Sequence, residues 1–147
     1  MIQALVGRNG EKDGPMASDD TPERPVERVM IVDDHAMIRS VIRSMLAGYA
    51  DLQIVGEASN GIEAIILMEQ LHPSIVLMDI NMPRMNGIKA TAHITSEYPQ
   101  TKIIGLSVNA AGENQELMTR AGAVCLIPKE QVDDLLYDAI QVAVKSR

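Results

Sequence analysis

The chain has 147 residues, of which 46% are hydrophobic, and its formal net charge is −7. This length and composition suit one domain of ordinary size with a real core, and they exclude an intrinsically disordered protein. The acidic balance disfavours direct binding to nucleic acid or to anionic lipid. No apolar run approaches the ~20 residues that span a bilayer. A single cysteine, Cys125, fits a reducing compartment, so we expect a cytoplasmic protein without a membrane segment.

The first part of the chain differs in composition from the rest. Residues 1–27 include the stretch GEKDGPMASDDTPERPVE, which concentrates Gly, Pro, Ser and acidic residues and has no apolar period to bury. We therefore expect a flexible tail or linker at residues 1–27 and one folded domain at residues 28–147.

From residue 28 onward, short apolar runs alternate with helical patterns. Strands are predicted at residues 29–32, 52–58, 75–78, 103–106 and 124–127, each followed by a helix, the last at residues 135–144. Strict alternation predicts an α/β fold with a parallel sheet and helices on both faces. The run 52–58 mixes polar with apolar residues, as an edge strand does, which favours the flavodoxin-like doubly wound strand order 2-1-3-4-5.

Four of the predicted strands are followed by polar residues. Asp33 and Asp34 follow the first strand, Asp79 the third, Ser107 the fourth, and Lys129 the fifth after one proline. In an open parallel sheet, the binding crevice lies outside the carboxyl ends of the strands. The pattern therefore predicts that three carboxylates, a hydroxyl and an ammonium group share one pocket.

Carboxylates placed this close together repel one another unless positive charge lies between them. Lys129 supplies one positive charge, and Mg²⁺, which prefers oxygen ligands, would supply more. A carboxylate beside both cations is a feasible phosphoryl acceptor, since aspartyl phosphate is an established covalent state. His35 is interpreted as a partly exposed residue of the first helical turn and not as a ligand of this ion.

Four segments of the chain together resemble a response-regulator receiver domain over about residues 28–145. They are VDDHAMIR, VLMDINMPRMNG, IIGLSVN and AGAVCLIPKE. The forms VDDH and SVNA are closest to receivers joined to helix-turn-helix output domains, or to those at the C-terminal ends of hybrid sensor kinases. The resemblance implies two-component signalling, in which Asp79 accepts a phosphoryl group from the phosphohistidine of a histidine kinase. Asp33, Asp34, Asp79 and the main-chain carbonyl of Asn81 would hold Mg²⁺.

The resemblance also implies roles for residues around the acceptor. Lys129 would pair with the phosphoryl group, and Ser107 would hydrogen-bond it after transfer. Asn81 and Asn109 would tune dephosphorylation. The family often has Tyr or Phe three residues before the lysine, where this chain has Leu126, so a switch at Leu126 would be a smaller change.

The resemblance implies a signalling partner and not an enzyme, with at most slow self-dephosphorylation. Partners would be the kinase and a downstream protein or fused output domain, and a homodimer could form through the fourth helix, fifth strand and fifth helix. One alternative is a Mg²⁺-dependent phosphatase with an aspartyl nucleophile, although such enzymes carry a second aspartate where this chain has Asn81. The other is an interaction module of the same fold that works without phosphorylation, which would not need the acids and Lys129.

Overall fold

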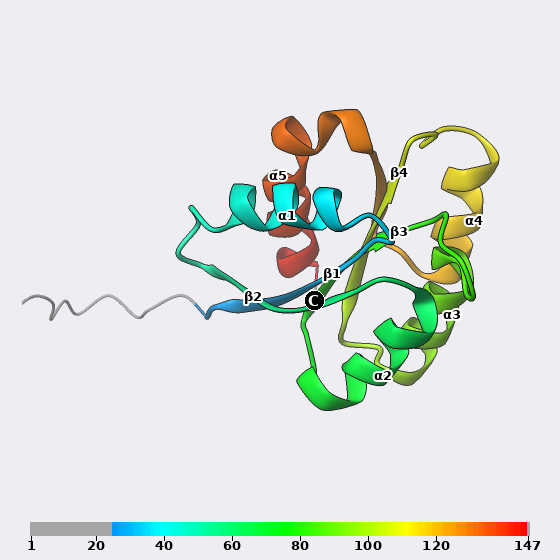
Figure 1. Cartoon of the computed structure of the whole chain (residues 1–147), viewed down its shortest axis with the longest axis horizontal. Helices are drawn as coiled ribbons and strands as arrows, with labels where there is room; N and C mark the ends of the chain where they lie inside the picture. Colours follow the sequence, from blue (N-terminus) through cyan, green and yellow to red (C-terminus); the bar gives the residue numbers. More distant parts are fainter. Residues whose placement is uncertain (1–24, 147) are drawn as a thin grey trace, which may run out of the picture.

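The computed structural model describes residues 25–146, so most of the tail expected at residues 1–27 lies outside the described residues. Strands and helices alternate along the rest of the chain, as the sequence predicts (Figure 1). In chain order they are β1 (Glu27–Val32), α1 (Ala36–Leu46), β2 (Leu52–Ala58), α2 (Gly61–Leu71), β3 (Ile75–Asp79), α3 (Gly87–Glu97), β4 (Lys102–Ser107), α4 (Glu113–Ala121), β5 (Cys125–Pro128) and α5 (Val132–Lys145).

The five strands form one parallel sheet in the order β2-β1-β3-β4-β5, which is the predicted flavodoxin-like order. The mixed strand β2 lies at the edge, also as predicted. Its pairing with β1 shifts by one residue where Val29 opposes Ile54 and Met30 opposes Gly56. Such a bulge disturbs the regular ladder of an edge strand and makes it a poorer template for pairing with another chain.

Helices cover both faces of the sheet. Figure 1 shows α1 and α5 on one side of it and α2 and α3 on the other, where α4 also packs. Side chains of β1 alternate between the two layers: Val29 and Ile31 pack with α1 and α5, whereas Met30 and Val32 pack with α2, α3 and α4. Both layers are built almost wholly from aliphatic side chains and methionine, as the scarcity of aromatic residues requires.

The last helix is longer than predicted. The apolar period indicates residues 135–144, but α5 begins at Val132 after a short 3₁₀ turn over Lys129–Gln131. Asp133 and Asp134 lie in its first turn, where acidic side chains interact favourably with the positive end of the helix dipole. Periodicity alone misses a first turn that is stabilised by charge and not by burial.

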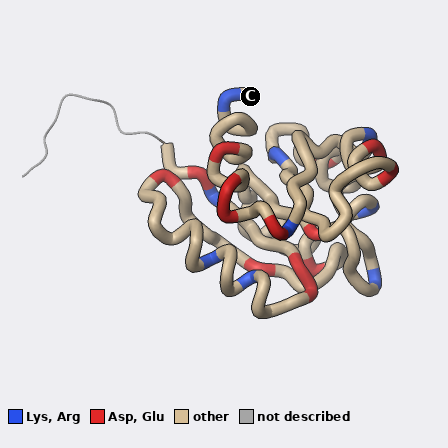
Figure 2. Tube along the Cα trace, turned by 90° about the horizontal axis from the view of Figure 1, so that it is seen from above, with Lys and Arg blue, Asp and Glu red and all other residues tan. Residues whose placement is uncertain are grey.

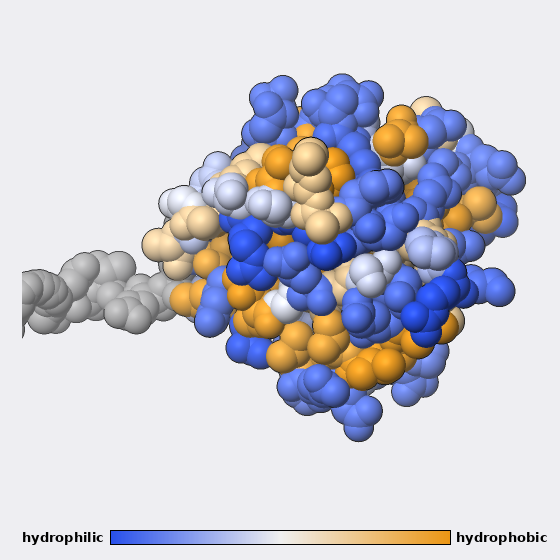
Figure 3. Space-filling view, viewed as in Figure 1, coloured by the Kyte–Doolittle hydropathy of each residue, from blue (hydrophilic) through white to orange (hydrophobic). Residues whose placement is uncertain are grey.

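The surface is mixed in character. Acidic and basic positions are spread over several elements and do not separate into two faces (Figure 2). In the view of Figure 3 an apolar patch lies over α2, whose Ile66 is 54% exposed. Within residues 25–146 no helix has the length and hydrophobicity needed to cross a bilayer.

Gly87 begins α3 directly against the end of β3. A Cβ atom at Gly87 would lie 2.0 Å from the main-chain oxygen of Asp79, far inside van der Waals contact. The amide of Gly87 also donates a hydrogen bond to the carbonyl oxygen of Ile80 at 2.7 Å. Only a residue without a side chain therefore allows the loop after β3 to close this tightly over the strand.

We expect Gly87→Ala to lower the free energy of unfolding by about 2–3 kcal/mol, because the new methyl group would push against backbone that cannot move aside cheaply. Gly48→Ala is the matched control, since a Cβ at Gly48 meets nothing within 4 Å. The control is expected to be neutral or to stabilise by less than about 1 kcal/mol. Urea unfolding followed by circular dichroism measures both, and equal effects of the two substitutions would contradict the close approach.

Candidate functional site

Strand register brings the ends of four strands to one edge of the sheet. Val32 pairs with Met78, so Asp33 follows β1 level with Asp79 at the end of β3. Asp79 in turn pairs with Leu106, which places Ser107 one residue further along β4. Ser107 pairs with Pro128, and Lys129 follows directly. The structure therefore gathers the polar groups that follow the buried strands.

Asp33 is wholly buried and each of its polar groups meets a defined neighbour. Its amide donates to the carbonyl oxygen of Ala58 at 3.0 Å, which continues the pairing of β1 with β2. Its Oδ1 accepts a hydrogen bond from the amide of His35 at 2.8 Å, and its Oδ2 lies 2.8 Å from Nζ of Lys129. The turn between β1 and α1 is thereby closed by its own first acid.

Asp79 is 2% exposed, and its two carboxylate oxygens have different surroundings. Oδ1 lies 3.1 Å from Nζ of Lys129 and 3.4 Å from the amide nitrogen of Asn81. Oδ2 is buried and has no hydrogen-bond partner within the described residues. A buried carboxylate oxygen without a partner is costly, which indicates that this atom serves another purpose than stability.

The surroundings of Asp79 disfavour its charged form. Burial raises the pKa of the Asp79 carboxyl from 3.8 to about 6, and the nearby Asp33 carboxylate adds to the rise, whereas Lys129 opposes it. Burial also opposes the charge on Lys129, but its contacts with Asp33 and Asp79 outweigh burial and raise the pKa of the ammonium. One cation thus serves two buried acids, and the site holds more negative charge than Lys129 offsets.

The donor set of the pocket suits a divalent cation. Ligand atoms of Asp33, Asp34, His35 and Asp79 all lie within 4.8 Å of one another. Three of these four groups are carboxylates, the ligands that hard cations such as Mg²⁺ prefer. The excess negative charge and the unpartnered Oδ2 of Asp79 point to the same class of ligand.

His35 lies closer to the acids than the sequence interpretation expects. It is exposed, as expected, but it precedes α1 and does not lie in its first turn. Its Nδ1 is 3.2 Å from Oδ1 of Asp33 and 3.1 Å from Oδ1 of Asp34. The dipeptide Asp34-His35 was the only signal of this contact, because spacing along the chain does not say which way a ring turns.

Ser107 is buried and its hydroxyl is engaged by the loop that follows β4. The Oγ atom donates to the main-chain oxygen of Asn109 at 2.9 Å and accepts from the amide of Asn109 at 3.0 Å. The Asn109 side chain takes no part in this pair. The main-chain oxygen of Asn109 also accepts from Nδ2 of Asn114 at 2.9 Å, which ties the loop to the start of α4.

Leu126 lies in β5, and Asn81 lies in the loop after β3. Leu126 is half-buried beside Gly105, where a Cβ would approach its Cδ1 to 2.7 Å. It also lines a hollow with Val108, Ala110 and other residues of the loop after β4. Asn81 is exposed after β3. The metal ligation expected for its main-chain carbonyl stays a prediction.

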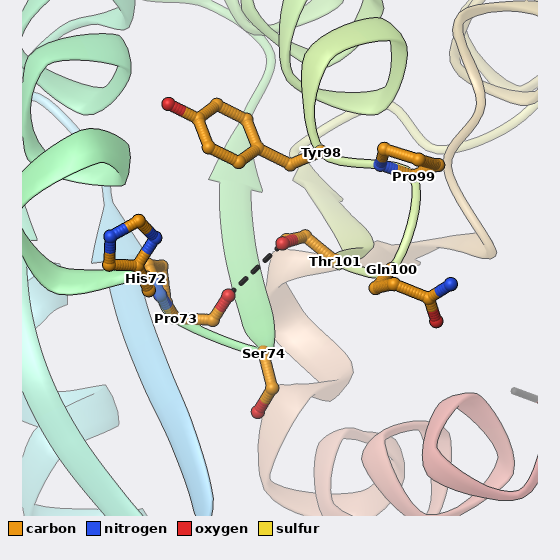
Figure 4. A pocket seen from close by; sticks show the side chains of 7 residues that line it. All are labelled: His72, Pro73, Ser74, Tyr98, Pro99, Gln100 and Thr101. Atoms are coloured by element: carbon orange, nitrogen blue, oxygen red, sulfur yellow. Dashed lines mark hydrogen bonds between the residues drawn. The ribbon is translucent and has the colours of Figure 1, made fainter.

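A separate hollow lies at the opposite end of the sheet. Figure 4 shows side chains from the loops before β3 and β4 around it, with the hydroxyl of Thr101 donating to the carbonyl of Pro73 at 3.1 Å. Its lining residues are His72, Pro73, Ser74, Tyr98, Pro99, Gln100 and Thr101. None of them belongs to the acid pocket, because these loops lead into the amino ends of the strands.

Sequence reasoning missed a linked group of three charged residues beside the turn after β1, namely Arg39, Arg43 and Glu57. Arg39 of α1 donates from Nη1 to the main-chain oxygen of Asp33 at 2.6 Å and from Nε to Glu57 of β2 at 2.9 Å. Arg43 reaches the other carboxylate oxygen of Glu57 at 2.6 Å. The available signal was the i, i+4 spacing of the two arginines, which places them on one face of a helix.

The family model described as the response regulator receiver domain matches residues 29–141. The chain belongs to the response-regulator receiver-domain family.

Several relatives carry such a domain as part of a longer chain. This receiver is 31% identical over 118 residues to the transcriptional regulatory protein DegU of Brevibacillus brevis, covering 80% of this chain and 50% of that protein. It is 41% identical over 105 residues to protein-glutamate methylesterase/protein-glutamine glutaminase 1 of Methanosarcina mazei, covering 71% and 29%. The chain thus spans half or less of the length of these relatives, which include a regulator and an enzyme.

Solved structures agree with the fold. The response regulator domain of Thermotoga maritima CheB matches with a TM-score of 0.76 and 32% identity, over 82% of this chain and 97% of that one. A LuxR-family two-component response regulator from Aurantimonas matches with a TM-score of 0.78 and 29% identity, over 83% and 87%. LuxR-family receivers correspond to the first of the two groups named from the sequence.

The raised pKa of Asp79 predicts that this acid destabilises the metal-free receiver at neutral pH. The unfolded chain releases the proton near pH 3.8 and the folded chain near pH 6, so the free energy of unfolding falls as pH rises between these values. In chelator at pH 7.5, Asp79→Asn should therefore raise the free energy of unfolding by about 1–3 kcal/mol. The gain should vanish toward pH 4.

Thermal and urea unfolding at several pH values measure this effect. Asp138→Asn, which changes an exposed acid of α5, is the control and should stay within about 0.5 kcal/mol of wild type. A variant Asp79→Asn that is no more stable than wild type at pH 7.5 would show that the buried acid costs the fold nothing.

Proposed function

We propose that this chain is a phospho-accepting receiver of two-component signalling, in which Asp79 takes a phosphoryl group from the phosphohistidine of a histidine kinase. The observation that carries the proposal is the asymmetry of the Asp79 carboxylate. Oδ1 is held by Lys129 at 3.1 Å, while Oδ2 is buried and unpartnered within the described residues. One oxygen is thus fixed and the other is available for a bond to phosphorus.

The transfer is a substitution at phosphorus. Oδ2 of Asp79 donates an electron pair to phosphorus as the bond from phosphorus to the imidazole nitrogen of the donor breaks. The imidazole keeps the electron pair of the broken bond, and the product on this chain is an acyl phosphate. Lys129 would offset charge on the phosphoryl oxygens, since its ammonium already lies within 3.1 Å of both Asp33 and Asp79.

Mg²⁺ fits the donor set of this pocket. We propose that Asp33, Asp34 and Asp79 hold it together with the main-chain carbonyl of Asn81. When bound, such an ion supplies positive charge to the oxygens of the transferring group. The support is the cluster of carboxylate oxygens within 4.8 Å and the fact that, in the part of the chain that the structure describes, Lys129 is the one ammonium paired with them.

The signal would leave the site through Ser107. Among the described residues its hydroxyl has only the main chain of Asn109 as its partner, so a phosphoryl group on Asp79 would compete with that pair for the hydroxyl. Loss of the pair would free the loop that lines the hollow beside Leu126. We propose that this loop, α4, β5 and α5 form the face that a downstream protein, a fused output domain or a second copy reads, and that Asn81 and Asn109 set the lifetime of the phosphate.

The test is labelling by acetyl phosphate with Mg²⁺, followed by intact-mass spectrometry. Wild type should gain the mass of one phosphoryl group, and Asp79→Asn should gain none, because an amide cannot form the acyl phosphate. Lys129→Ala should label more slowly by about 10²-fold or more, since it loses the charge opposite the phosphoryl oxygens. Asp138→Asn, on exposed α5, should label like wild type.

Other outcomes favour the alternatives. Labelling of Asp79→Asn equal to wild type would assign the acceptor elsewhere. Sustained release of orthophosphate from a small phosphoester by wild type, lost in Asp79→Asn, would indicate a phosphatase. A wild-type chain that neither labels nor binds Mg²⁺ would indicate an interaction module that works without phosphorylation.

A further inference from the structure

Arg39 connects three parts of the fold beside the acid pocket. It is the fourth residue of α1, and its side chain is only 19% exposed. One nitrogen, Nη1, donates to the main-chain oxygen of Asp33 at 2.6 Å. Another, Nε, donates to Oε1 of Glu57 near the end of β2 at 2.9 Å. A single planar group therefore ties the turn after β1 to its neighbouring strand.

This contact completes the bonding of Asp33. Its amide is held by β2 and its carboxylate by His35 and Lys129, so the carbonyl is the remaining polar group of the residue. Because a peptide unit is planar, the direction of the Asp33 carbonyl also sets the position of the Asp34 amide and Cα. The Asp34 side chain leaves the backbone at that point. The hydrogen bond from Arg39 thus reaches the second acid of the cluster through the peptide plane.

We propose that Arg39 is a positioning residue for the metal-binding acids Asp33 and Asp34, and that Glu57 holds Arg39 in that place. The inference rests on the proposed function, because it assigns these acids to a cation. It concerns only the turn that presents them and adds no ligand to the site.

Glu57 forms ion pairs with two arginines of α1. Its two carboxylate oxygens accept separately, Oε1 from Arg39 at 2.9 Å and Oε2 from Arg43 at 2.6 Å. Burial opposes the charge on Glu57, but the two arginines outweigh it and lower the pKa of this carboxyl. Without Glu57, the guanidinium of Arg39 would be drawn toward the carboxylates of the pocket, where it would compete with a cation.

The two contacts require a guanidinium group. Nε and Nη1 of one rigid plane point to different acceptors, Glu57 and the carbonyl of Asp33. A lysine carries a single ammonium on a flexible stem and cannot reproduce a planar fork. Lysine at this position would keep the charge but lose the geometry.

Positioning and simple electrostatics predict opposite results. If Arg39 acted only through its positive charge, its removal would strengthen the binding of a divalent cation to the nearby acids. If it acts by orienting the turn, its removal weakens binding, and loss of such supporting contacts commonly costs 10–100-fold in metal affinity. The sign of the change therefore separates the two.

The experiment measures the Kd of Mg²⁺, and of Mn²⁺ as a probe, by titration calorimetry on the full chain. Arg39→Gln and Arg39→Lys should both weaken binding, Arg39→Gln by about tenfold or more. Arg43→Gln is the matched control, because Arg43 lies one turn further along α1 on the same Glu57 but has no hydrogen bond to the Asp33 turn among the described residues. It should bind the ions like wild type.

A second readout needs no metal. In chelator, amide hydrogen exchange at Asp34 and His35 should be faster in Arg39→Gln than in wild type, and unchanged in Arg43→Gln. If Arg39 had only a general structural role, both arginine variants would lose stability alike. Exchange at Asp34 and His35 would then not differ between them. If Arg39→Gln does not fold, Arg39→Lys and Glu57→Gln decide the matter, and both are expected to weaken Mg²⁺ binding.

The outcomes for the two proposals are distinct. Arg39→Gln with unchanged or tighter Mg²⁺ binding, beside a wild type that binds Mg²⁺ and labels, would overturn the positioning role alone. A wild type that binds neither ion and does not label would overturn the proposed function instead. In that case faster exchange at Asp34 in Arg39→Gln would still support the orienting role of Arg39, and unchanged exchange would remove it.

Discussion

The repulsion between the buried carboxylates of Asp33 and Asp79, only partly offset by the ammonium group of Lys129, is the central interaction of this pocket. Lys129 lies 2.8 Å from one acid and 3.1 Å from the other, so its single charge is divided between them. The result is a pocket that stays negative and an acid whose pKa rises to about 6 through burial and its neighbour. The fold gains no stability from such a site, and the proposed function supplies a reason for keeping it.

The rest of the structure holds these charged groups together at one edge of the sheet. Parallel register sets the four strand ends level, and the apolar layers on both faces keep the sheet rigid beneath them. Gly87 lets the loop after β3 close against the main-chain oxygen of Asp79. Arg39 and Glu57 fix the turn after β1 from the side. Each of these features fixes the backbone next to an acidic residue, and none of them neutralises the charge of that residue.

Most of the fold was accessible from the sequence because buried parallel strands leave a clear signature. Unbroken apolar runs marked the inner strands, and the mixed composition of residues 52–58 identified the edge strand. The start of α5 was misjudged because Val132 begins a turn that Asp133 and Asp134 stabilise by charge, which a search for apolar period does not detect.

The sequence likewise predicts some residues of the candidate site and not others. Asp33, Asp79, Ser107 and Lys129 could be grouped from the sequence alone, since each follows a strand and the strands are parallel. The contact of His35 with both acids could not, because it depends on the rotation of a ring. Nor could the link from Arg39 to Glu57, which joins α1 to the edge strand across 18 positions of the chain. Contacts that depend on the orientation of a side chain are only weakly indicated by the spacing of residues along the sequence.

The position of Lys129 along the chain has a consequence for folding during synthesis. A ribosome makes a chain from the amino end, so Asp33, Asp34 and Asp79 are synthesised before Lys129, which pairs with two of them. In a nascent chain that ends before β5, these acids would lack that counter-charge. The last strand of the sheet to be synthesised, β5, therefore comes directly before the residue that supplies the counter-charge.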